Sequence, residues 1–383
     1  MDSPFIYDRY VTGKNFIGRR GDCTVLGNLI MQGEHVVFME PPKTGVMSLI
    51  QQTLFNLRMA ANAFVVGQFS LLNVRDLAGF LTRMGGTVLR TVASTPGEYA
   101  DLIATHLSGT HFVFDQKNYS DNDQIVSLNW DPDDEDIMAM LRLPYRIARA
   151  SGQQIFLIID EFQNLEFTGE GDRVYKALEK VMGEIRGDNR PGCSFILCGS
   201  RVNAMKDIFQ HRRFFYRMAE HLPLSTVDEK EIIEYVVRGF LSSGKVVERE
   251  LLLGMCRLFR NNLWYIAHFT AICDSLSKGY IIEATLMEAL GNLISIHEPR
   301  FASTMNSLTT FQVGLLRAIL DGHTRFSASE IIQRYGLNSS ANVKRLKDAL
   351  MKKEIVTFDE KDEPTLLDPL FEYWVRKYFF EMQ

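Results

Sequence analysis

The stretch His35-Val-Val-Phe-Met-Glu-Pro-Pro-Lys-Thr-Gly-Val-Met-Ser-Leu-Ile50 decides the fold of this 383-residue chain. Residues 35–39 form an apolar run, which is typical of a strand buried on both faces of a sheet. Two prolines and a glycine then interrupt the pattern, and residues 48–57 carry apolar side chains at helical spacing. The stretch therefore predicts a strand, a loop and a helix in that order.

Two later apolar runs end in polar residues in the same way. Residues 154–159 lead into Asp160-Glu161, and residues 193–198 lead into Gly199-Ser200. Strands that alternate with helices predict a three-layer α/β domain with a mostly parallel sheet, which we place at residues 1–225. Ligands bind outside the carboxyl ends of such strands, so we expect these polar residues and the loop after the first strand at one crevice.

The rest of the chain predicts smaller features and two further domains. Within residues 111–129 we expect two short strands around a polar turn, beside the main sheet. Residues 226–300 have a wholly helical pattern and predict an α-helical lid domain. Residues 301–383 predict helices followed by two short strands around a charged turn, which is the order of a winged helix-turn-helix.

Composition and charge narrow the class of protein. With 46% hydrophobic and 23% charged residues, the chain has the composition of a folded globular protein. A net charge of -5 provides no overall attraction to nucleic acid or to anionic lipid. The five cysteines are scattered and are not spaced for zinc or redox chemistry, so we expect reduced thiols. Neither a signal-peptide pattern nor an apolar stretch of about 18 residues occurs, and we expect a cytoplasmic protein without a membrane partner.

The loop Glu40-Pro-Pro-Lys-Thr-Gly-Val-Met47 has the position of a phosphate-binding loop (P-loop) but little of its chemistry. A P-loop cradles phosphates with backbone amides, and it adds a lysine for the outer phosphates and a hydroxyl for magnesium. Aligned on the strand and the helix, Val46 takes the lysine position and Met47 the hydroxyl position. Gly45 is retained, but Glu40 replaces the first glycine and brings a negative charge, so triphosphate binding should be weakened.

Two substitutes for the missing groups remain open, and so does the role of the acidic pair. Lys43, next to Thr44, is a candidate to reach inward, and Ser48 is a candidate to bind magnesium after a one-residue shift. An apolar strand ending in Asp160-Glu161 suits a site where one acid holds magnesium and the next polarises a water molecule. The alternative is a strand that simply ends in a charged turn.

Six segments together resemble a known family. They are Asn15-Phe-Ile-Gly-Arg-Arg20, the degenerate P-loop, Ile158-Ile-Asp-Glu-Phe-Gln163, Ile196-Leu-Cys-Gly-Ser200, Phe214-Phe-Tyr-Arg217 and Leu367-Asp-Pro-Leu-Phe371. In this order they look like the archaeal-type ATPases of the STAND branch of the AAA+ superfamily. The resemblance covers nearly the whole chain and implies ATP or ADP with Mg²⁺ as cofactors, although Val46 puts their binding in doubt.

The resemblance also implies roles for single residues. Phe16, Ile17 and Gly18, with Arg19, match the N-terminal box that lies against the adenine. A loop that merely packs on the core would explain the same residues.

The remaining implied roles are catalytic. Asp160 matches the magnesium-site acid, with Ser48 as the second candidate metal ligand, and Glu161 matches the catalytic acid. Ser200 matches the polar sensor of the terminal phosphate, although a helix N-cap is an equal alternative. Arg217 stands where the family carries an arginine able to approach a phosphate, and a surface salt bridge is the alternative.

These features favour a pseudo-ATPase, a nucleotide-responsive switch or scaffold in which hydrolysis is weak or absent. A working ATPase that uses Asp160 and Glu161 is one alternative, and a winged-helix DNA-binding regulator is the other. As partner we expect a protein or a second copy of the chain. DNA remains possible through Lys344, Arg345 and Lys347, although an acidic turn at residues 359–363 lies where the wing would meet DNA.

Overall fold

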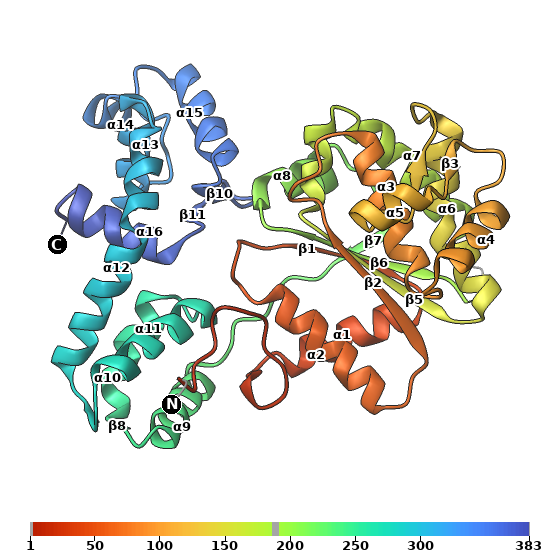
Figure 1. The fold of residues 1–383 in the computed structure, drawn as a ribbon. Coiled ribbons are helices and arrows are strands. Elements are labelled where there is room, and N and C mark those ends of the chain that lie inside the picture. Colours follow the sequence, from red (N-terminus) through yellow and green to blue (C-terminus); the bar gives the residue numbers. More distant parts are fainter. Residues whose placement is uncertain (1–2, 186–190, 383) are drawn as a thin grey trace. The chain divides into compact units, whose positions relative to one another are not determined.

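Two units, each with its own hydrophobic core, make up the computed structural model, which describes residues 3–185 and 191–382 (Figure 1). The first unit, here called the α/β unit, consists of residues 21–40 and 52–224. The second, here called the lid unit, consists of residues 1–20, 41–51 and 225–383. The P-loop residues after Glu40 therefore group with the N-terminal segment and the C-terminal half of the chain.

The α/β unit is built on a five-stranded sheet with the order β2-β5-β6-β1-β7. Its strands are β1 His35–Met39, β2 Phe64–Ser70, β5 Gln154–Asp160, β6 Cys193–Gly199 and β7 Ala219–His221. All neighbouring pairs are parallel, which confirms the predicted mostly parallel sheet. Every residue of β1 and β6 is buried, as expected for continuous apolar runs that are covered on both faces.

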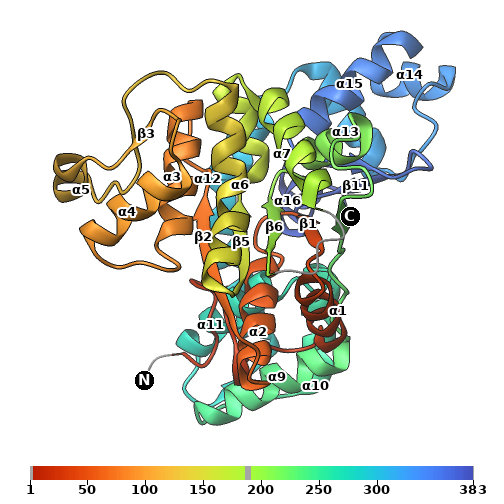
Figure 2. The ribbon, with the colours of Figure 1, turned by 90° about the vertical axis from the view of Figure 1, so that its right-hand side faces the viewer.

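Helices cover both faces of this sheet and confirm the three-layer architecture. Figures 1 and 2 show α1 and α2 on one face and α3, α6 and α7 on the other. The helical elements are α1 Arg20–Met31, α2 Val46–Met59, α3 Leu77–Leu89, α4 Pro96–His106, α5 Gln116–Asn122, α6 Asp134–Ser151, η2 Phe162–Thr168, α7 Gly171–Ile185, α8 Val202–Lys206 and η3 Asp207–His211. The acidic run at residues 131–136 opens α6, because Asp133 and Asp136 form a reciprocal capping box there.

The excursion at residues 111–129 differs from the prediction in one respect. Strands β3 Phe112–Val113 and β4 Ser127–Leu128 do pair in antiparallel fashion. The segment between them is helix α5 and not a polar turn, because the Asp115 carboxylate accepts hydrogen bonds from the backbone N–H groups of Lys117 and Asn118.

The lid unit contains the following elements after η1 Gly13–Asn15: α9 Glu229–Ser242, β8 Val246–Val247, α10 Arg249–Leu258, α11 Leu263–Leu276, β9 Tyr280–Ile281, α12 Glu283–Asn306, α13 Thr310–Leu320, α14 Ser329–Tyr335, α15 Ser340–Lys352, β10 Val356–Phe358, β11 Pro364–Leu366, α16 Pro369–Trp374 and η4 Val375–Phe379. The region predicted as wholly helical is therefore not entirely so. Strands β8 and β9 form a short parallel ladder from β-branched and aromatic residues.

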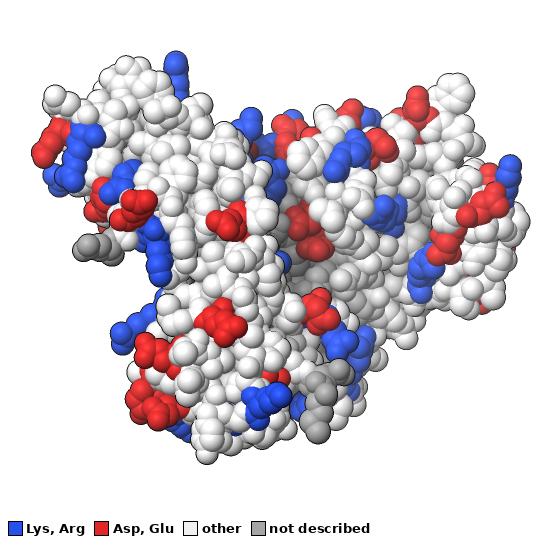
Figure 3. All heavy atoms as spheres, turned by 60° about the vertical axis from the view of Figure 1, so that its left-hand side comes forward, with Lys and Arg blue, Asp and Glu red and all other residues white. Residues whose placement is uncertain are grey.

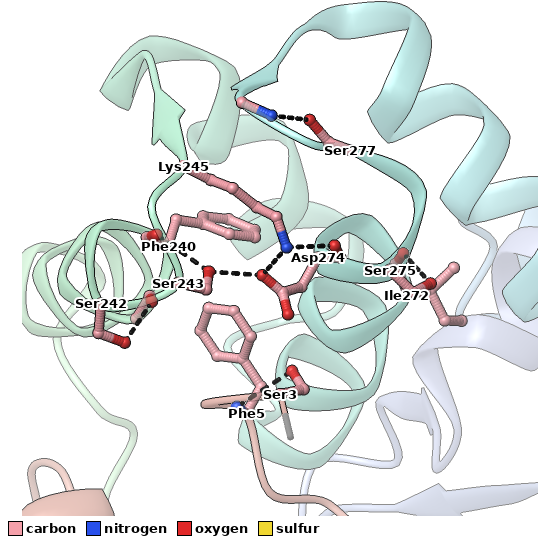
Figure 4. A network of polar contacts seen from close by, with 12 residues as sticks. Ser3, Phe5, Phe240, Ser242, Ser243, Lys245, Ile272, Asp274, Ser275 and Ser277 are labelled. Carbon is pink, nitrogen blue, oxygen red and sulfur yellow. Dashed lines mark hydrogen bonds and ion pairs between the residues drawn. The ribbon is translucent and has the colours of Figure 1, made fainter. Parts of the chain in front are cut away.

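A buried ion pair holds the start of this ladder (Figure 4). The Lys245 ammonium lies 2.5 Å from Oδ1 of Asp274, which also accepts a hydrogen bond of 2.6 Å from the Ser243 hydroxyl. The Lys245 and Asp274 side chains are only 12% and 9% exposed. The network fixes the end of α9 against α11, since a buried charge without its partner would be costly.

The winged helix forms as predicted from α13 to the β10–β11 hairpin, whose strands pair in antiparallel register with Val356 opposite Leu366. Gly336, in the left-handed region at φ 64°, ends α14, and the Ser339 hydroxyl caps α15. The final segment is α16 followed by a π-helical turn. The boundary that we placed at residue 300 lies inside α12.

All five cysteines lie in the described part of the chain, where each is buried and free of disulfide bonds. Among the helices of residues 3–185 and 191–382, none has the length and apolar character required to cross a lipid bilayer.

Candidate functional site

The sheet brings the polar strand ends of the α/β unit to one edge. Strand β6 lies between β5 and β1, with Ile159 opposite Leu197 and Met39 opposite Gly199. Because the strands are parallel, the residues that follow them, Glu161, Ser200 and Glu40, leave the sheet at the same edge. This is the edge at which α/β sheets bind ligands.

Glu161 is held by two hydrogen-bond donors on one carboxylate oxygen. The Ser200 hydroxyl donates to Oε2 at 2.9 Å, and the Gln163 side-chain amide donates to the same oxygen at 2.5 Å. The backbone of Glu161 is in the left-handed region at φ 55°, a conformation that costs a non-glycine residue about 1 kcal/mol. The resemblance implied that Glu161 and Ser200 act at one site, as catalytic acid and phosphate sensor. In the structure the two side chains are in direct contact.

Gln163 is a member of this site that the sequence analysis did not identify as functional. Its side chain is 1% exposed, and among the described residues its Oε1 atom has no hydrogen-bond partner. A side chain on Gly199 would come within 2.6 Å of that oxygen, so the glycine makes room for the amide. A buried acceptor without a partner costs about 1–3 kcal/mol, and the amide nevertheless turns its N–H toward Glu161. The only sequence signal was its place in the motif at residues 158–163.

Asp160 ends β5 and has Ser70 of β2 as its partner in register. Burial raises the pKa of Asp160 above its usual value, and the neighbouring Glu161 carboxylate raises it further. A divalent cation at this carboxylate would counter both effects, since it favours the charged form. The oxygen ligands at this strand end therefore suit Mg²⁺.

Glu40, which the sequence alignment puts at the first glycine of the P-loop, has a structural contact. Its Oε1 atom accepts a hydrogen bond of 3.0 Å from the backbone N–H of Leu224. Two residues earlier in the same segment, the backbone N–H of Leu222 donates a hydrogen bond to the Val37 carbonyl of β1. Glu40 therefore helps to fasten the segment after β7 to the end of β1.

The P-loop backbone passes twice through the left-handed region before α2. Lys43 and Gly45 lie in the left-handed region at φ 67° and 98°, and α2 begins directly afterwards at Val46. The Thr44 hydroxyl donates to the Pro41 carbonyl at 2.8 Å, which closes the turn. Amides in such turns and at the N-terminus of a 14-residue helix attract anions, so the backbone fits a phosphate group.

The first two side chains of α2 do not fit magnesium. Val46 has no cation and Met47 offers a thioether, a soft group that Mg²⁺ does not select. The Ser48 hydroxyl oxygen accepts a hydrogen bond of 3.1 Å from the backbone N–H of Val11. The acid at the end of β5 suits the metal, whereas Val46 and Met47 offer no ligand for it. Ser48 as a second metal ligand stays a prediction, because a hydroxyl oxygen that accepts one hydrogen bond keeps a second lone pair.

Lys43 does not point back over its own loop. Its ammonium lies 3.6 Å from the ring centre of Trp264, at the start of α11 in the same unit. Burial lowers the pKa of Lys43, with Arg300 adding to the effect and Asp368 opposing it. A cation on an indole face is stabilised by about 0.5–2 kcal/mol, which holds Lys43 on the lid.

The N-terminal box packs within the lid unit. Ile17 contacts the hydrophobic core of that unit, and a side chain on Gly18 would come within 2.7 Å of Val227. Gly18 also has φ 62°, so both space and conformation require glycine. Arg19 donates from Nη1 to the Thr44 carbonyl at 2.7 Å and from Nε to the Ser225 carbonyl at 2.9 Å. Phe16 follows η1, and a role of these residues at an adenine remains a prediction.

Arg217 lies in the α/β unit with its guanidinium 5.2 Å from the ring centre of exposed Tyr216. The contact that Arg217 makes among the described residues is this one with Tyr216, and a role at a phosphate stays a prediction. Two other arginines, Arg75 and Arg201, lie over the ring of half-exposed Phe167 at 5.3 and 5.8 Å. The three residues Arg75, Phe167 and Arg201 are far apart in the sequence, so their contact could not be predicted from it.

Comparison with known proteins agrees with this architecture. Residues 299–377 match the model of a family described as a probable winged helix domain. The fold is similar to that of a Walker-type ATPase of Pyrococcus abyssi, with a TM-score of 0.67 at 14% identity, covering 97% of this chain and 99% of the other. It is also similar to the ORC2 protein of Aeropyrum pernix, solved as ADPNP-ADP complexes, with a TM-score of 0.56 at 13% identity, covering 95% and 93%. A search of curated protein sequences finds no match.

At these identities the likeness shows the fold alone. The chain has the α/β fold of P-loop ATPases, with a mostly parallel sheet, a helical part and a C-terminal winged helix domain. The predicted fold class is thereby confirmed.

Proposed function

We propose that this protein is a nucleotide-responsive switch or scaffold of the STAND type, which hydrolyses ATP weakly or not at all. The observation that carries the proposal is the start of α2, where Val46 takes the position of the phosphate-binding lysine. The loop's own lysine, Lys43, has its ammonium on the Trp264 indole. The STAND assignment rests on the sequence motifs.

The contrast between backbone and side chains supports binding without efficient turnover. The left-handed turns at Lys43 and Gly45 and the N-terminus of α2 attract phosphate through the backbone. Stabilising the transition state of phosphoryl transfer requires, in addition, a cation on the outer phosphates and a correctly held metal. Neither Val46 nor Met47 supplies these groups.

Contacts inside the lid unit support the switch. The Trp264 indole N–H donates to the Tyr7 carbonyl at 2.6 Å, while Lys43 lies over its ring. On the same helix, the Tyr265 hydroxyl donates to Asp368 at 2.8 Å, and Asp368 caps α16 of the winged helix. Helix α11 therefore contacts the P-loop, the N-terminal segment and the winged helix, and a change in the loop reaches all of them.

Nucleotide affinity and turnover, measured on the purified chain beside Val46→Lys, test the proposal. We expect the unmodified chain to bind nucleotide with little turnover and Val46→Lys to bind the triphosphate more tightly. ATP turnover in the unmodified chain that disappears in Glu161→Gln would overturn it. That result would establish the alternative of a working ATPase, which the contacts of Glu161 with Ser200 and Gln163 favour.

The partner of the switch is, in this proposal, a protein or a second copy of the chain. Light scattering with and without nucleotide tests self-association directly. A mass that stays that of one chain under both conditions would leave a different protein as the partner.

DNA binding by the winged helix is the second candidate, because Lys344 and Arg345 are exposed on α15. Lys347 is not equally available, since Asp362 of the wing pairs with its ammonium and the Phe358 ring lies 4.8 Å away. On the face drawn in Figure 3, Lys and Arg side chains are interspersed with Asp and Glu. DNA binding by the winged helix would therefore have to rely on a local group of basic residues such as Lys344 and Arg345.

A salt-dependent shift with duplex DNA tests this candidate. If DNA is the partner, replacing Lys344 and Arg345 by alanine abolishes the shift, while Lys361→Ala in the wing preserves most of it. No shift at low salt would rule DNA out and leave the protein partner.

A further inference from the structure

We propose that Arg19 supplies the positive charge for phosphate in this P-loop, in place of the lysine that Val46 has replaced. The inference rests on the proposed nucleotide-responsive function and deepens it by naming the residue that recognises the phosphate. The sequence resemblance placed Arg19 against the adenine, so the two assignments predict different behaviour.

The contacts of Arg19 place its guanidinium at the loop. Nη1 donates to the carbonyl oxygen of Thr44 at 2.7 Å, and a side chain on Gly45 would lie only 3.0 Å from the same nitrogen. Gly45 is the one glycine of the P-loop pattern that the chain retains. The guanidinium therefore lies beside the turn at Gly45, on the side of the Thr44 carbonyl.

The backbone before α1 holds Arg19 in this position. Gly18 and Arg19 are both left-handed, at φ 62° and 51°, which turns the chain sharply toward the loop. Nε of Arg19 donates to the Ser225 carbonyl at 2.9 Å and anchors the other edge of the guanidinium. Little conformational entropy is then lost when an anion binds, because the side chain is already ordered.

Other cations of the lid unit near the loop have different attachments. Lys43 lies over Trp264, and burial lowers its pKa. Arg300 is paired with Asp368 at 2.8 Å and also donates to the Tyr265 hydroxyl. Of these three side chains, Arg19 is the one that donates a hydrogen bond to a carbonyl of the loop.

The chemistry of arginine suits the task. A guanidinium has five N–H donors in a planar fork, so it can hold a backbone carbonyl and donate to a phosphate at the same time. As a class, guanidinium groups stay protonated in proteins. The ligand class is a nucleoside di- or triphosphate, recognised through its phosphates without a requirement for magnesium.

Calorimetric titration without magnesium tests the proposal with adenosine, AMP, ADP and ATP. The variants are Arg19→Gln, Arg19→Lys and, as a control from the next position, Arg20→Gln. We expect Arg19→Gln to weaken ATP by about tenfold to a hundredfold, ADP by less, and adenosine by less than about twofold. Arg19→Lys keeps the charge and should retain most of the ATP affinity, and Arg20→Gln should match the unmodified chain.

The outcomes separate this inference from the function on which it rests. An equal loss for adenosine and ATP in Arg19→Gln would overturn the inference and return Arg19 to the adenine, with nucleotide responsiveness intact. An unmodified chain that binds none of the four ligands would overturn both proposals.

Two further measurements guard against a variant that is merely misfolded. Thermal unfolding of Arg19→Gln detects damage from the lost bonds to Thr44 and Ser225. Adding Val46→Lys to Arg19→Gln should restore the dependence of affinity on phosphate number, because the lysine returns a cation to the loop. Failure of that double variant to recover, in a folded protein, would contradict a charge role for Arg19.

Discussion

The strand end at Asp160-Glu161 and the P-loop carry two halves of one motif set, and the structure holds them in different ways. At the strand end the side chains contact one another, with Ser200 and Gln163 both donating to Glu161. In the loop the backbone keeps its turns, but the side chains contact other segments, Lys43 at Trp264 and Ser48 at Val11. The side chains of the strand end therefore contact one another, whereas those of the loop contact segments outside it.

The largest expected effect contrasts the two glycines of these regions. Gly199→Ala should lower the free energy of unfolding by about 3 kcal/mol, because the added carbon collides with the buried side chains of Met205 and Gln163. Gly45→Ala should cost only about 1–2 kcal/mol, since it meets one arginine atom and a left-handed backbone. Urea titration of the full chain measures both.

Gly254→Ala is the matched control, because Gly254 lies in α10 with open space at its Cβ position. Removing this glycine from a helix should be neutral or slightly stabilising. Equal losses at positions 199 and 45 would contradict a tighter network at the strand end.

The next effect compares two serines. Ser200→Ala removes a hydrogen bond to a carboxylate and should cost about 1.5–2 kcal/mol, allowing for partial exposure. Ser48→Ala removes an acceptor for one backbone N–H and should cost about 1 kcal/mol or less. The difference should vanish in a Glu161→Gln background, where the carboxylate partner is absent. A difference that persists there would show that Ser200 stabilises the fold independently of Glu161.

The main sheet was predictable from sequence, whereas the smaller elements were not. Strands β1, β5 and β6 lie within one residue of their predicted bounds, because a buried parallel strand requires a continuous apolar run. Helix α5 was missed, since one capping carboxylate at Asp115 turns a polar segment into a helix. Strands β8 and β9 have two residues each and leave no periodicity to detect.

The candidate site was likewise predictable from sequence only in part. The residue types at the strand ends indicated the site, because carboxylates after apolar strands are a local pattern. The contact of Gln163 with Glu161 depends on space left by Gly199 on the neighbouring strand, and the position of Lys43 depends on Trp264, far along the chain. Both depend on tertiary packing that spacing does not encode.

The third prediction tests the loop's attachment to the lid. Lys43→Met should destabilise the protein by less than about 1 kcal/mol, because a sulfur–aromatic contact recovers only part of the stabilisation that a cation gives on an indole face. It should also change the fluorescence of Trp264, which loses the neighbouring charge. Lys14→Met, a change at an exposed lysine of η1, provides the control. Identical spectra for the two variants would contradict the contact on which the switch depends.

The smallest expected effect is a pH dependence at the strand end. Burial and the Glu161 charge raise the pKa of Asp160 in the folded protein, so the folded state binds the proton more tightly than the unfolded state. Stability from this group is therefore fully present below its unfolded pKa of 3.8 and is lost as the pH rises through the folded pKa.

Asp160→Asn should consequently stabilise the protein at neutral pH, and the gain should disappear below pH 3.8. Urea titrations of both chains across this range measure the difference. Ser70→Ala, at the partner position on β2, leaves the charge unchanged and should show no such dependence. If Mg²⁺ binds this carboxylate, adding it should stabilise the unmodified chain and leave Asp160→Asn unaffected, because only the charged form attracts the cation. A magnesium response in the unmodified chain that is absent from Asp160→Asn would show that the strand end binds the metal through this carboxylate.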